Sequence, residues 1–450
     1  MHDLTQGSIV RHLIKMAVPI ALGMLFQTLY FLVDLYFVAK LGDSAIAGVG
    51  AAGNLTFLVM ALTQVLGVGT TTLISHASGR KDAVDANLVF NQSLVLAFVC
   101  AVATLVGGWI FVAPYMHTLG ADAATQDAGI AYLLWYLPGL AMQFAIAAMG
   151  SALRGAGLAK PGMLVQMLTV LLNIILAPVL IAGWGTGHPM GVAGAGLATT
   201  LSIGVGVVLL ALYFVKLEKF VVFDSKLWAP RFDTWNRILR IGLPAGGEFA
   251  LMFVYMAVIY SIIRPFGSAA QAGFGIGGRV MQAIFLPAMA VAFAASPIAG
   301  QNMGAGLFER VRATFRSAIV IGSSIMLTLT LLCQVKPDLL VGVFTQDPAV
   351  IAVAADFLHF ISWNFVASGI VFTCSGLFQA LGNTIPSLLS SGSRFLTFVL
   401  PAFWLSQQPG FTLRQLWMVS VASVGSQALI SLWLLFRQFA QRLQPAAAPA

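Results

Sequence analysis

Residues 19–44 read PIALGMLFQTLYFLVDLYFVAKLGDS, an apolar run of membrane-spanning length with a proline near its start. One carboxylate, Asp34, lies well inside this run. An ionised Asp at the centre of a bilayer helix costs about 2.5–3.5 kcal/mol on insertion scales, so such residues usually face a cavity or a polar partner. The run therefore predicts a membrane helix that carries a functional carboxylate. The alternative is an Asp near enough to the outer interface to reach water.

The whole chain has the composition of a polytopic membrane protein. Of its 450 residues, 59% are hydrophobic and only 8% are charged, whereas soluble domains average about 25% charged residues. The net charge of +8 comes from basic residues in short segments between apolar runs, so topology explains it and nucleic-acid binding is not expected. The sequence has no CxxC pair, Walker A motif, metal-ligand cluster or nucleophile–base arrangement. We therefore expect no organic cofactor, no resident metal and no enzyme active site.

Twelve segments are long enough to cross a bilayer at about 20 residues each. Their Lys and Arg residues fall unevenly, with seventeen in the segments on one side and four in those on the other. Because cytoplasmic loops carry the excess of Lys and Arg, both termini are expected in the cytoplasm, at a bacterial inner membrane. The predicted spans are 14–38, 45–74, 88–112, 128–152, 162–183, 190–215, 240–264, 270–298, 316–335, 350–378, 385–405 and 414–437.

The second half of the chain repeats the first at a shift of 225 residues. Six helices per half is an even number, so the two halves share one orientation and should be related by a pseudo-two-fold axis along the membrane normal. We predict an all-α polytopic membrane protein of twelve transmembrane helices in two six-helix lobes, the arrangement of alternating-access transporters. The matched pairs include Pro19/Pro244, Gly42/Gly267, Gly79/Gly304, Gly157/Gly382 and Pro161/Pro386. The predicted domains are an N-lobe at 1–215, a cytoplasmic linker at 216–239, a C-lobe at 240–443 and a disordered tail at 444–450.

Three polar residues of the first half meet apolar residues at the same shift. With a rise of about 1.5 Å per residue, all three lie roughly 10–15 Å from the outer end of their helices. They are therefore expected to surround one small cation. The alternative is that each is a separate polar residue bonded to backbone. The pairs are Asp34 with Ile259, Asn173 with Phe398, and Thr199 with Val424.

Four further residues are weaker candidates. Gln27 and Tyr30 lie seven and four residues before Asp34 on its helical face and are expected to hydrogen-bond to it; Gln27 is also a candidate for substrate binding. Glu248, about 10 Å from the cytoplasmic end of the seventh span, either binds substrate cations or extends to the cytoplasm. Pro19 removes a backbone hydrogen bond, so it predicts a hinge, unless it is a first-turn proline without a dynamic role.

Three segments carry a family resemblance: LTQGSIVRHLIKMAVPIALGMLFQTLYFLVDLYFVAKLG at 4–42, LRGAGLAKP at 153–161 and FQALGNTIP at 378–386. They resemble the MATE multidrug and toxic-compound extrusion transporters, and the DinF-like branch most. The resemblance spans almost all twelve predicted helices. It implies a two-lobed secondary antiporter that exports organic cations in exchange for H⁺ or Na⁺.

The same resemblance implies roles for single residues. It matches Asp34 to the first-helix carboxylate, Tyr30 to the tyrosine one turn earlier, and Pro19 to a bending proline. It also implies that Asn173 and Thr199 are ligands in the fifth and sixth helices, and that Tyr136 is a further polar neighbour. The chain departs from the family at Ala177, where a second Asp is common, and losing that carboxylate weakens a Na⁺ site.

We therefore expect a monomeric multidrug efflux antiporter driven by H⁺, with Asp34 as the proton carrier and hydrophobic organic cations as substrates. The alternatives are a Na⁺-coupled antiporter that binds Na⁺ at Asp34, Asn173 and Thr199, a lipid-linked oligosaccharide flippase of the same superfamily, and a polytopic membrane enzyme. A flippase would need a more cationic cavity than Arg279 and Arg394 provide. An enzyme would need clustered acids or histidines at one interface, which the sequence lacks.

Overall fold

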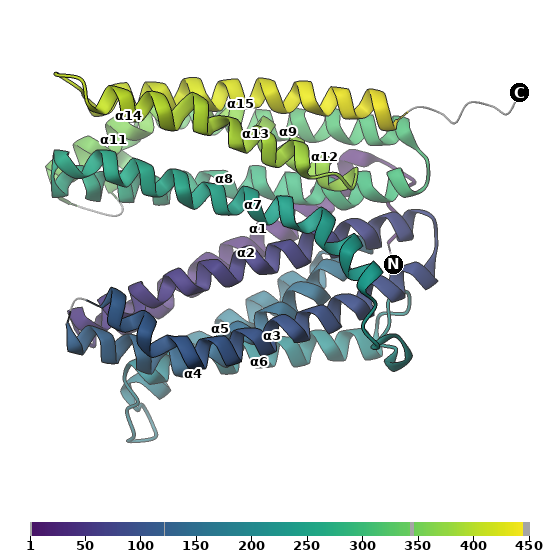
Figure 1. Cartoon of the computed structure of the whole chain (residues 1–450), viewed down its shortest axis with the longest axis horizontal. Coiled ribbons are helices and arrows are strands. Elements are labelled where there is room, and N and C mark those ends of the chain that lie inside the picture. Colours follow the sequence, from purple (N-terminus) through teal and green to yellow (C-terminus); the bar gives the residue numbers. More distant parts are fainter. Residues whose placement is uncertain (1, 121, 343–345, 444–450) are drawn as a thin grey trace, which may run out of the picture. The chain divides into compact units, whose positions relative to one another are not determined.

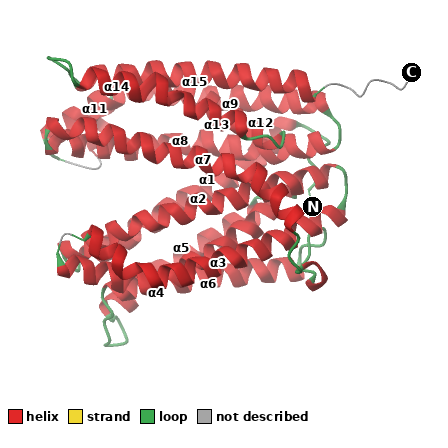
Figure 2. Ribbon diagram, viewed as in Figure 1, coloured by secondary structure: helices red, strands yellow, loops and turns green. Residues whose placement is uncertain are grey.

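The computed structural model describes residues 2–120, 122–342 and 346–443, and within these ranges it contains helices and loops but no strand (Figure 2). Eleven described helices are long and apolar enough to cross a membrane, and a bent helix pair makes a twelfth span. The prediction of an all-α protein with twelve spans is therefore confirmed. The tail predicted at 444–450 lies outside the described residues.

The helices extend a few residues beyond most predicted spans, because apolar composition marks only the part of a helix that faces lipid. In the first half they are α1 (Ile9–Ala39), α2 (Asp43–Gly79), α3 (Ala83–Leu119), α4 (Ala123–Gly155), α5 (Lys160–Ala182) and α6 (Val192–Lys216). In the second half they are η1 (Ser225–Leu227), α7 (Phe232–Ile263), η2 (Arg264–Phe266), α8 (Ser268–Gly304), α9 (Phe308–Val335), α10 (Pro337–Gly342), α11 (Pro348–Ile361), α12 (Asn364–Ala380), α13 (Ile385–Arg394), the π-helical η3 (Phe395–Val399), α14 (Leu400–Ser406) and α15 (Leu413–Arg442).

Two predicted spans are not regular helices. The span predicted at 350–378 is broken between α11 and α12, which are bent by 59°. The Ser362 carbonyl at this break accepts hydrogen bonds from the Phe365 amide at 3.1 Å and from the Thr330 hydroxyl of α9 at 2.9 Å, so it is satisfied in spite of the bend. The span predicted at 385–405 contains the π-helical turn, which ends two residues before Pro401. A proline ring clashes with the carbonyl four residues earlier, here that of Thr397, and a widened turn relieves the clash.

The chain divides into two compact units. Unit 1 contains Leu22–Gly242 with the first three residues, and unit 2 contains Leu4–Ala21 and the chain from Leu243 onward. Within unit 1, α4 packs against α2, α3 and α6, and α5 packs against α6 (Figure 1). Within unit 2, α8 packs against α9, α11 and α12, and α12 packs against α15.

The segment that precedes α7 is tied to unit 1 by polar side chains of α3. The Gln92 side-chain amide donates to the carbonyls of Leu227 and Ala229 at 2.6 and 2.8 Å, and its oxygen accepts from the Arg231 amide at 2.9 Å. Arg237, near the start of α7, forms an ion pair of 2.9 Å with Asp85. The predicted linker at 216–239 is therefore partly helical, since α7 already begins at Phe232.

The segment that precedes α1 is tied to unit 2 in a similar way. The Leu4 amide donates to the Gln301 side chain at 2.9 Å, and the Arg310 guanidinium donates to the Gly7 carbonyl at 3.1 Å. The boundary between the units consequently falls inside α1, after Ala21, and inside α7, after Gly242.

Candidate functional site

A buried carboxylate lies in the second half of α1, in unit 1. The Asp34 side chain is 7% exposed, although its neighbours Leu35 and Tyr36 are exposed. Thr199 of α6, which is 1% exposed, donates its hydroxyl to Asp34 Oδ2 over 3.1 Å. Asp34 Oδ1 has no hydrogen-bond partner among the described residues. Two residues that have apolar counterparts in the repeat are therefore in direct contact.

Three tyrosines surround this contact. Tyr30, one turn before Asp34, donates its hydroxyl to the Thr199 carbonyl over 3.3 Å. Tyr132 and Tyr136, one turn apart on α4, are buried with ring centroids 5.2 Å apart. Both rings are electrostatic neighbours of Asp34. The carboxylate therefore lies among phenolic hydroxyls from two helices.

Asn173 of α5 lies beside Asp34 and is 0% exposed. Neither its Nδ2 nor its Oδ1 has a hydrogen-bond partner among the described residues. An unsatisfied buried polar group costs about 1–3 kcal/mol, so native proteins keep few of them. An amide next to a carboxyl group can serve both protonation states, because Nδ2 can donate to the ionised form and Oδ1 can accept from the protonated form. The Asn173 amide is thus suited to a carboxyl group that gains and loses a proton.

The cluster around Asp34 contains a single carboxylate. Its oxygens come from one carboxylate, one amide and several hydroxyls, which are ligands for a proton or a hard monovalent cation. Ala177, one turn after Asn173, is 0% exposed and contributes no oxygen. The described residues contain no group of three or more His, Cys, Asp or Glu side chains that would hold a metal ion.

Two other candidates on α1, Gln27 and Pro19, are not hydrogen-bonded to the carboxylate. Gln27 is half-buried, and no hydrogen bond joins it to Asp34 in the described part of the chain. Pro19 is buried, and α1 continues through it as one helix from Ile9 to Ala39. The boundary between the two units falls three residues after Pro19.

Glu248 of α7 lies in unit 2, in a cluster of serine hydroxyls. Ser387 and Ser375 donate to its Oε2 at 2.7 and 3.0 Å, and Ser391 donates to its Oε1 at 3.3 Å. Gln427 of α15 in turn donates to the Ser391 hydroxyl at 3.2 Å. The half-buried carboxylate is therefore held by α12 and α13.

Sequence reasoning missed Tyr132 and the three serines. Tyr132 was within reach of the sequence, because it lies four residues before Tyr136 and so shares its helical face. The serines carry little signal, because serines in membrane helices commonly bond to the carbonyl four residues earlier.

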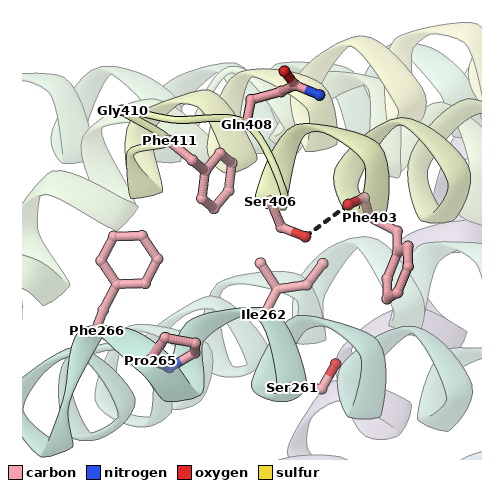
Figure 3. A pocket seen from close by; sticks show the side chains of 9 residues that line it. All are labelled: Ser261, Ile262, Pro265, Phe266, Phe403, Ser406, Gln408, Gly410 and Phe411. Atoms are coloured by element: carbon pink, nitrogen blue, oxygen red, sulfur yellow. Dashed lines mark hydrogen bonds between the residues drawn. The ribbon is translucent and has the colours of Figure 1, made fainter.

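A pocket of about 370 Å³ lies at the other end of α7 (Figure 3). Its wall consists mainly of Phe266, Phe403, Phe411 and Pro265, with Gln408 at its edge. The Ser406 hydroxyl donates to the Phe403 carbonyl over 2.7 Å, so it already has an acceptor inside the wall. No charged residue and none of the predicted site residues lines this pocket, and it is not the candidate site.

Comparison with known proteins identifies the family. The family model MatE matches residues 19–179 and again 244–404, two ranges that differ by the 225 residues of the predicted repeat. "Probable multidrug resistance protein YpnP" of Bacillus subtilis (strain 168) is 26% identical over 422 residues, covering 93% of this chain and 91% of that protein. "Probable multidrug resistance protein NorM" of Thermotoga maritima is 28% identical over 405 residues, covering 89% and 84%.

Solved structures agree with these relatives. The outward-facing conformation of a multidrug resistance MATE family transporter of the MOP superfamily matches with a TM-score of 0.91 at 25% identity, covering 98% of each chain. The family consists of transporters, so the expectation that this protein is not an enzyme is confirmed. With a family model that matches both halves, a repeat of the same length and twelve spans, this chain belongs to the MATE family of multidrug efflux transporters.

Proposed function

We propose that this protein exports hydrophobic organic cations in exchange for H⁺, with Asp34 as the proton-carrying group. The observation that carries the proposal is the buried Asp34 carboxyl group, which has one hydroxyl donor, Thr199, and a fully buried amide, Asn173, without a partner of its own. An ion pair would hold such a carboxylate permanently ionised. Hydroxyl and amide neighbours instead allow both protonation states.

The cycle follows from the contacts of Asp34. The ionised carboxylate accepts a hydrogen bond from Thr199, and the unpartnered Asn173 amide is available as a second donor. Protonation gives the carboxyl group an O–H that needs an acceptor instead. Protonation of Asp34 thus alters its hydrogen bond with Thr199, which joins α1 to α6. Pro19, close to the point where α1 passes from one unit to the other, is the hinge of this movement.

Gln27 and Glu248 are the candidate groups for cationic substrates. The protein works as a monomer in a bacterial inner membrane, with both termini in the cytoplasm, because the Lys and Arg residues are concentrated on that side.

Na⁺ is the second candidate for the coupling ion. Asp34, Asn173 and Thr199 offer oxygen ligands, which favours a hard cation, but Ala177 adds no second carboxylate to this site. With only one negative charge in the cluster, H⁺ is the better supported ion.

Purified protein in proteoliposomes separates these possibilities. With a pH gradient and no Na⁺, wild type is expected to transport ethidium, and Asp34→Asn is expected to lower the rate at least tenfold. Asp356→Asn is the matched control, because Asp356 pairs with Arg414 in unit 2. Full transport by Asp34→Asn would refute the role of Asp34. Transport that followed a Na⁺ gradient at constant pH would replace H⁺ by Na⁺.

A further inference from the structure

Two arginines of unit 2 lie near the ends of α9 and α15 that the predicted topology places in the cytoplasm. Arg316 and Arg437 are exposed, and neither forms a hydrogen bond or an ion pair with an oxygen atom in the part of the chain that the structure describes. The neighbouring arginines of the same two helices differ, because each donates a hydrogen bond of 2.8–3.1 Å to a backbone carbonyl. These are Arg310, Arg312 and Arg442. Arg316 and Arg437 are therefore the two cations at this end that the protein leaves available.

α9 and α15 run in opposite directions and meet through aromatic rings (Figure 1). The ring centroid of Phe315 of α9 lies 5.9 Å from that of Phe436 and 5.8 Å from that of Phe439, both of α15. Right-handed helices that run in opposite directions turn in opposite senses when they are viewed from one end. With these rings facing each other, Arg316 of α9 and Trp433 of α15 project to the same side of the helix pair.

This side of the helix pair combines exposed aromatic rings with the two arginines. The guanidinium carbon of Arg437 lies 5.7 Å from the ring centroid of Trp433, one turn earlier on α15. Trp433 is 60% exposed and Phe436 is 56% exposed. Tryptophan beside a basic residue is typical of the membrane–water interface, where the ring faces lipid and the charge faces the headgroups. We call Arg316, Trp433, Phe436 and Arg437 the α9/α15 face.

The depth of the two arginines corresponds to the level of the lipid phosphates. Arg316 lies roughly 12 Å from the start of α9 at Phe308, and Arg437 roughly 8 Å from the end of α15 at Arg442, at a rise of about 1.5 Å per residue. The headgroup region is about 5–8 Å thick on each side of the hydrocarbon core. Arginine side chains are long enough to extend from the edge of that core to the headgroups. Both guanidinium groups can therefore reach a phosphate.

We propose that the α9/α15 face binds an anionic phospholipid of the cytoplasmic leaflet. The lipid phosphate accepts hydrogen bonds from Arg316 and Arg437, because planar guanidinium groups match the geometry of phosphate oxygens. An acyl chain lies along the rings of Trp433 and Phe436. A zwitterionic lipid fits less well, because its own ammonium group would lie close to two arginines. This inference concerns the lipid around unit 2 and depends on neither the coupling ion nor the exported substrate.

Quenching of Trp433 fluorescence by lipids with brominated acyl chains tests the inference. The purified full-length protein in detergent is titrated with brominated phosphatidylglycerol or with phosphatidylcholine that carries the same chains. The Trp433 signal is the difference between wild type and Trp433→Phe. Phosphatidylglycerol is expected to quench Trp433 at a mole fraction lower by about fivefold or more, since each arginine near an anionic lipid contributes roughly that factor. Equal quenching by the two lipids would overturn the proposal.

Variants assign the preference to the two arginines. Arg316→Gln and Arg437→Gln are each expected to reduce the preference for phosphatidylglycerol about fivefold, and the double variant should remove it. Lys219→Gln combined with Arg231→Gln is the matched control, because it removes the same charge from exposed positions of unit 1 and should keep the preference. If the double arginine variant keeps the preference, or the control loses it, the α9/α15 face does not select the lipid. Replacing both arginines by lysine keeps the charge and should keep most of the preference, whether or not the Gln variant folds.

The midpoint of thermal unfolding distinguishes a lipid from a free anion. Phosphatidylglycerol is expected to raise the midpoint of wild type more than that of the double Gln variant. Inorganic phosphate at the same concentration is expected to leave both midpoints unchanged. An equal rise with inorganic phosphate would mean that the α9/α15 face binds an adventitious ion only, and it would overturn the lipid proposal.

Discussion

Replacing Gly242 by alanine is expected to destabilise the protein, because α7 crosses α2 at this glycine within unit 1. An added Cβ would lie 1.9 Å from the Val65 carbonyl oxygen, 2.7 Å from its carbonyl carbon and 3.0 Å from its Cγ1. The two nearest atoms belong to the backbone, so no change of rotamer relieves the overlap. The helices have to separate, and small residues at membrane helix crossings are what allow backbones to approach this closely.

Two opposing contributions set the change in the free energy of unfolding that Gly242→Ala causes. Overpacking a tight contact costs about 1–3 kcal/mol, and more where backbone has to move. Alanine regains about 0.8–1 kcal/mol relative to glycine through helix propensity. We therefore expect a net loss of roughly 2 kcal/mol, since a backbone overlap belongs at the upper end of the packing cost.

Alanine at Gly50 of α2 and Gly107 of α3 provides the control. A Cβ at either position meets no atom within 4 Å, so only the propensity term of up to about 1 kcal/mol acts, and it stabilises. The sign of the effect should thus differ between Gly242→Ala and the two controls.

The midpoint of thermal unfolding in detergent, measured by fluorescence-detected gel filtration at one heating rate, compares these variants. Gly69→Ala is a second test of the same crossing, because its Cβ would lie 2.3 Å from the Ile238 carbonyl oxygen. If both substitutions separate the same helices, the double variant should lose less than the sum of the single losses. A midpoint for Gly242→Ala at or above that of wild type, with the controls behaving as expected, would refute the close crossing of α2 and α7.

Three further outcomes are expected. Thr199→Val removes the hydroxyl donor of Asp34, and a hydrogen bond to a charged group contributes about 1.5–3 kcal/mol. Proton-driven ethidium efflux should therefore fall at neutral pH and recover towards alkaline pH, whereas Thr199→Ser should resemble wild type. Equal rates for the Val variant at every pH would contradict this role of Thr199. Gln92→Leu leaves three backbone groups of the segment before α7 without their partner. Trypsin should therefore cut at Lys226 or Arg231 faster than in wild type or in the control Gln407→Leu. Unchanged digestion would contradict the role of Gln92 in holding this segment against α3. Asp122 caps α4 by accepting a hydrogen bond of 2.7 Å from the Thr125 amide, which holds the pKa of Asp122 below its ordinary value. The stabilising effect of the cap is present above that ordinary value and is lost as pH falls through the lowered pKa, so the difference in unfolding midpoint between wild type and Asp122→Ala should shrink from about pH 7 to about pH 3. A constant difference would contradict the cap.

The membrane spans and the repeat could be predicted from the sequence because both are properties of the chain taken in order. A span needs a continuous apolar run, which is local, and the repeat is a constant offset between residues. The offset of 225 residues recurs in the two ranges that the family model matches. The break between α11 and α12 was missed, because no proline lies at the break itself and a hydroxyl of another helix, that of Thr330, contributes to the hydrogen bonding of the Ser362 carbonyl.

The candidate site could be predicted only in part. The apolar counterparts of Asp34 and Thr199 and their similar depth indicated that they belong together, and the two side chains are in contact. Depth along a helix follows from residue number, but rotation about the helix axis is set by packing against other helices. For this reason the sequence did not indicate that Tyr132 faces Asp34, or that Gln27 does not hydrogen-bond to it.

Glu248 and Arg394 show the same limit most clearly. Sequence alone determined that each is a charged residue within an apolar span, and that neither has a charged counterpart at the repeat offset. Only the tertiary structure decided that Glu248 lies among serines more than a hundred residues away in sequence and that Arg394 faces aromatic rings. The physical reason is that hydrogen-bond partners of a buried charge are chosen by side-chain geometry across helices, and no one-dimensional pattern records that geometry.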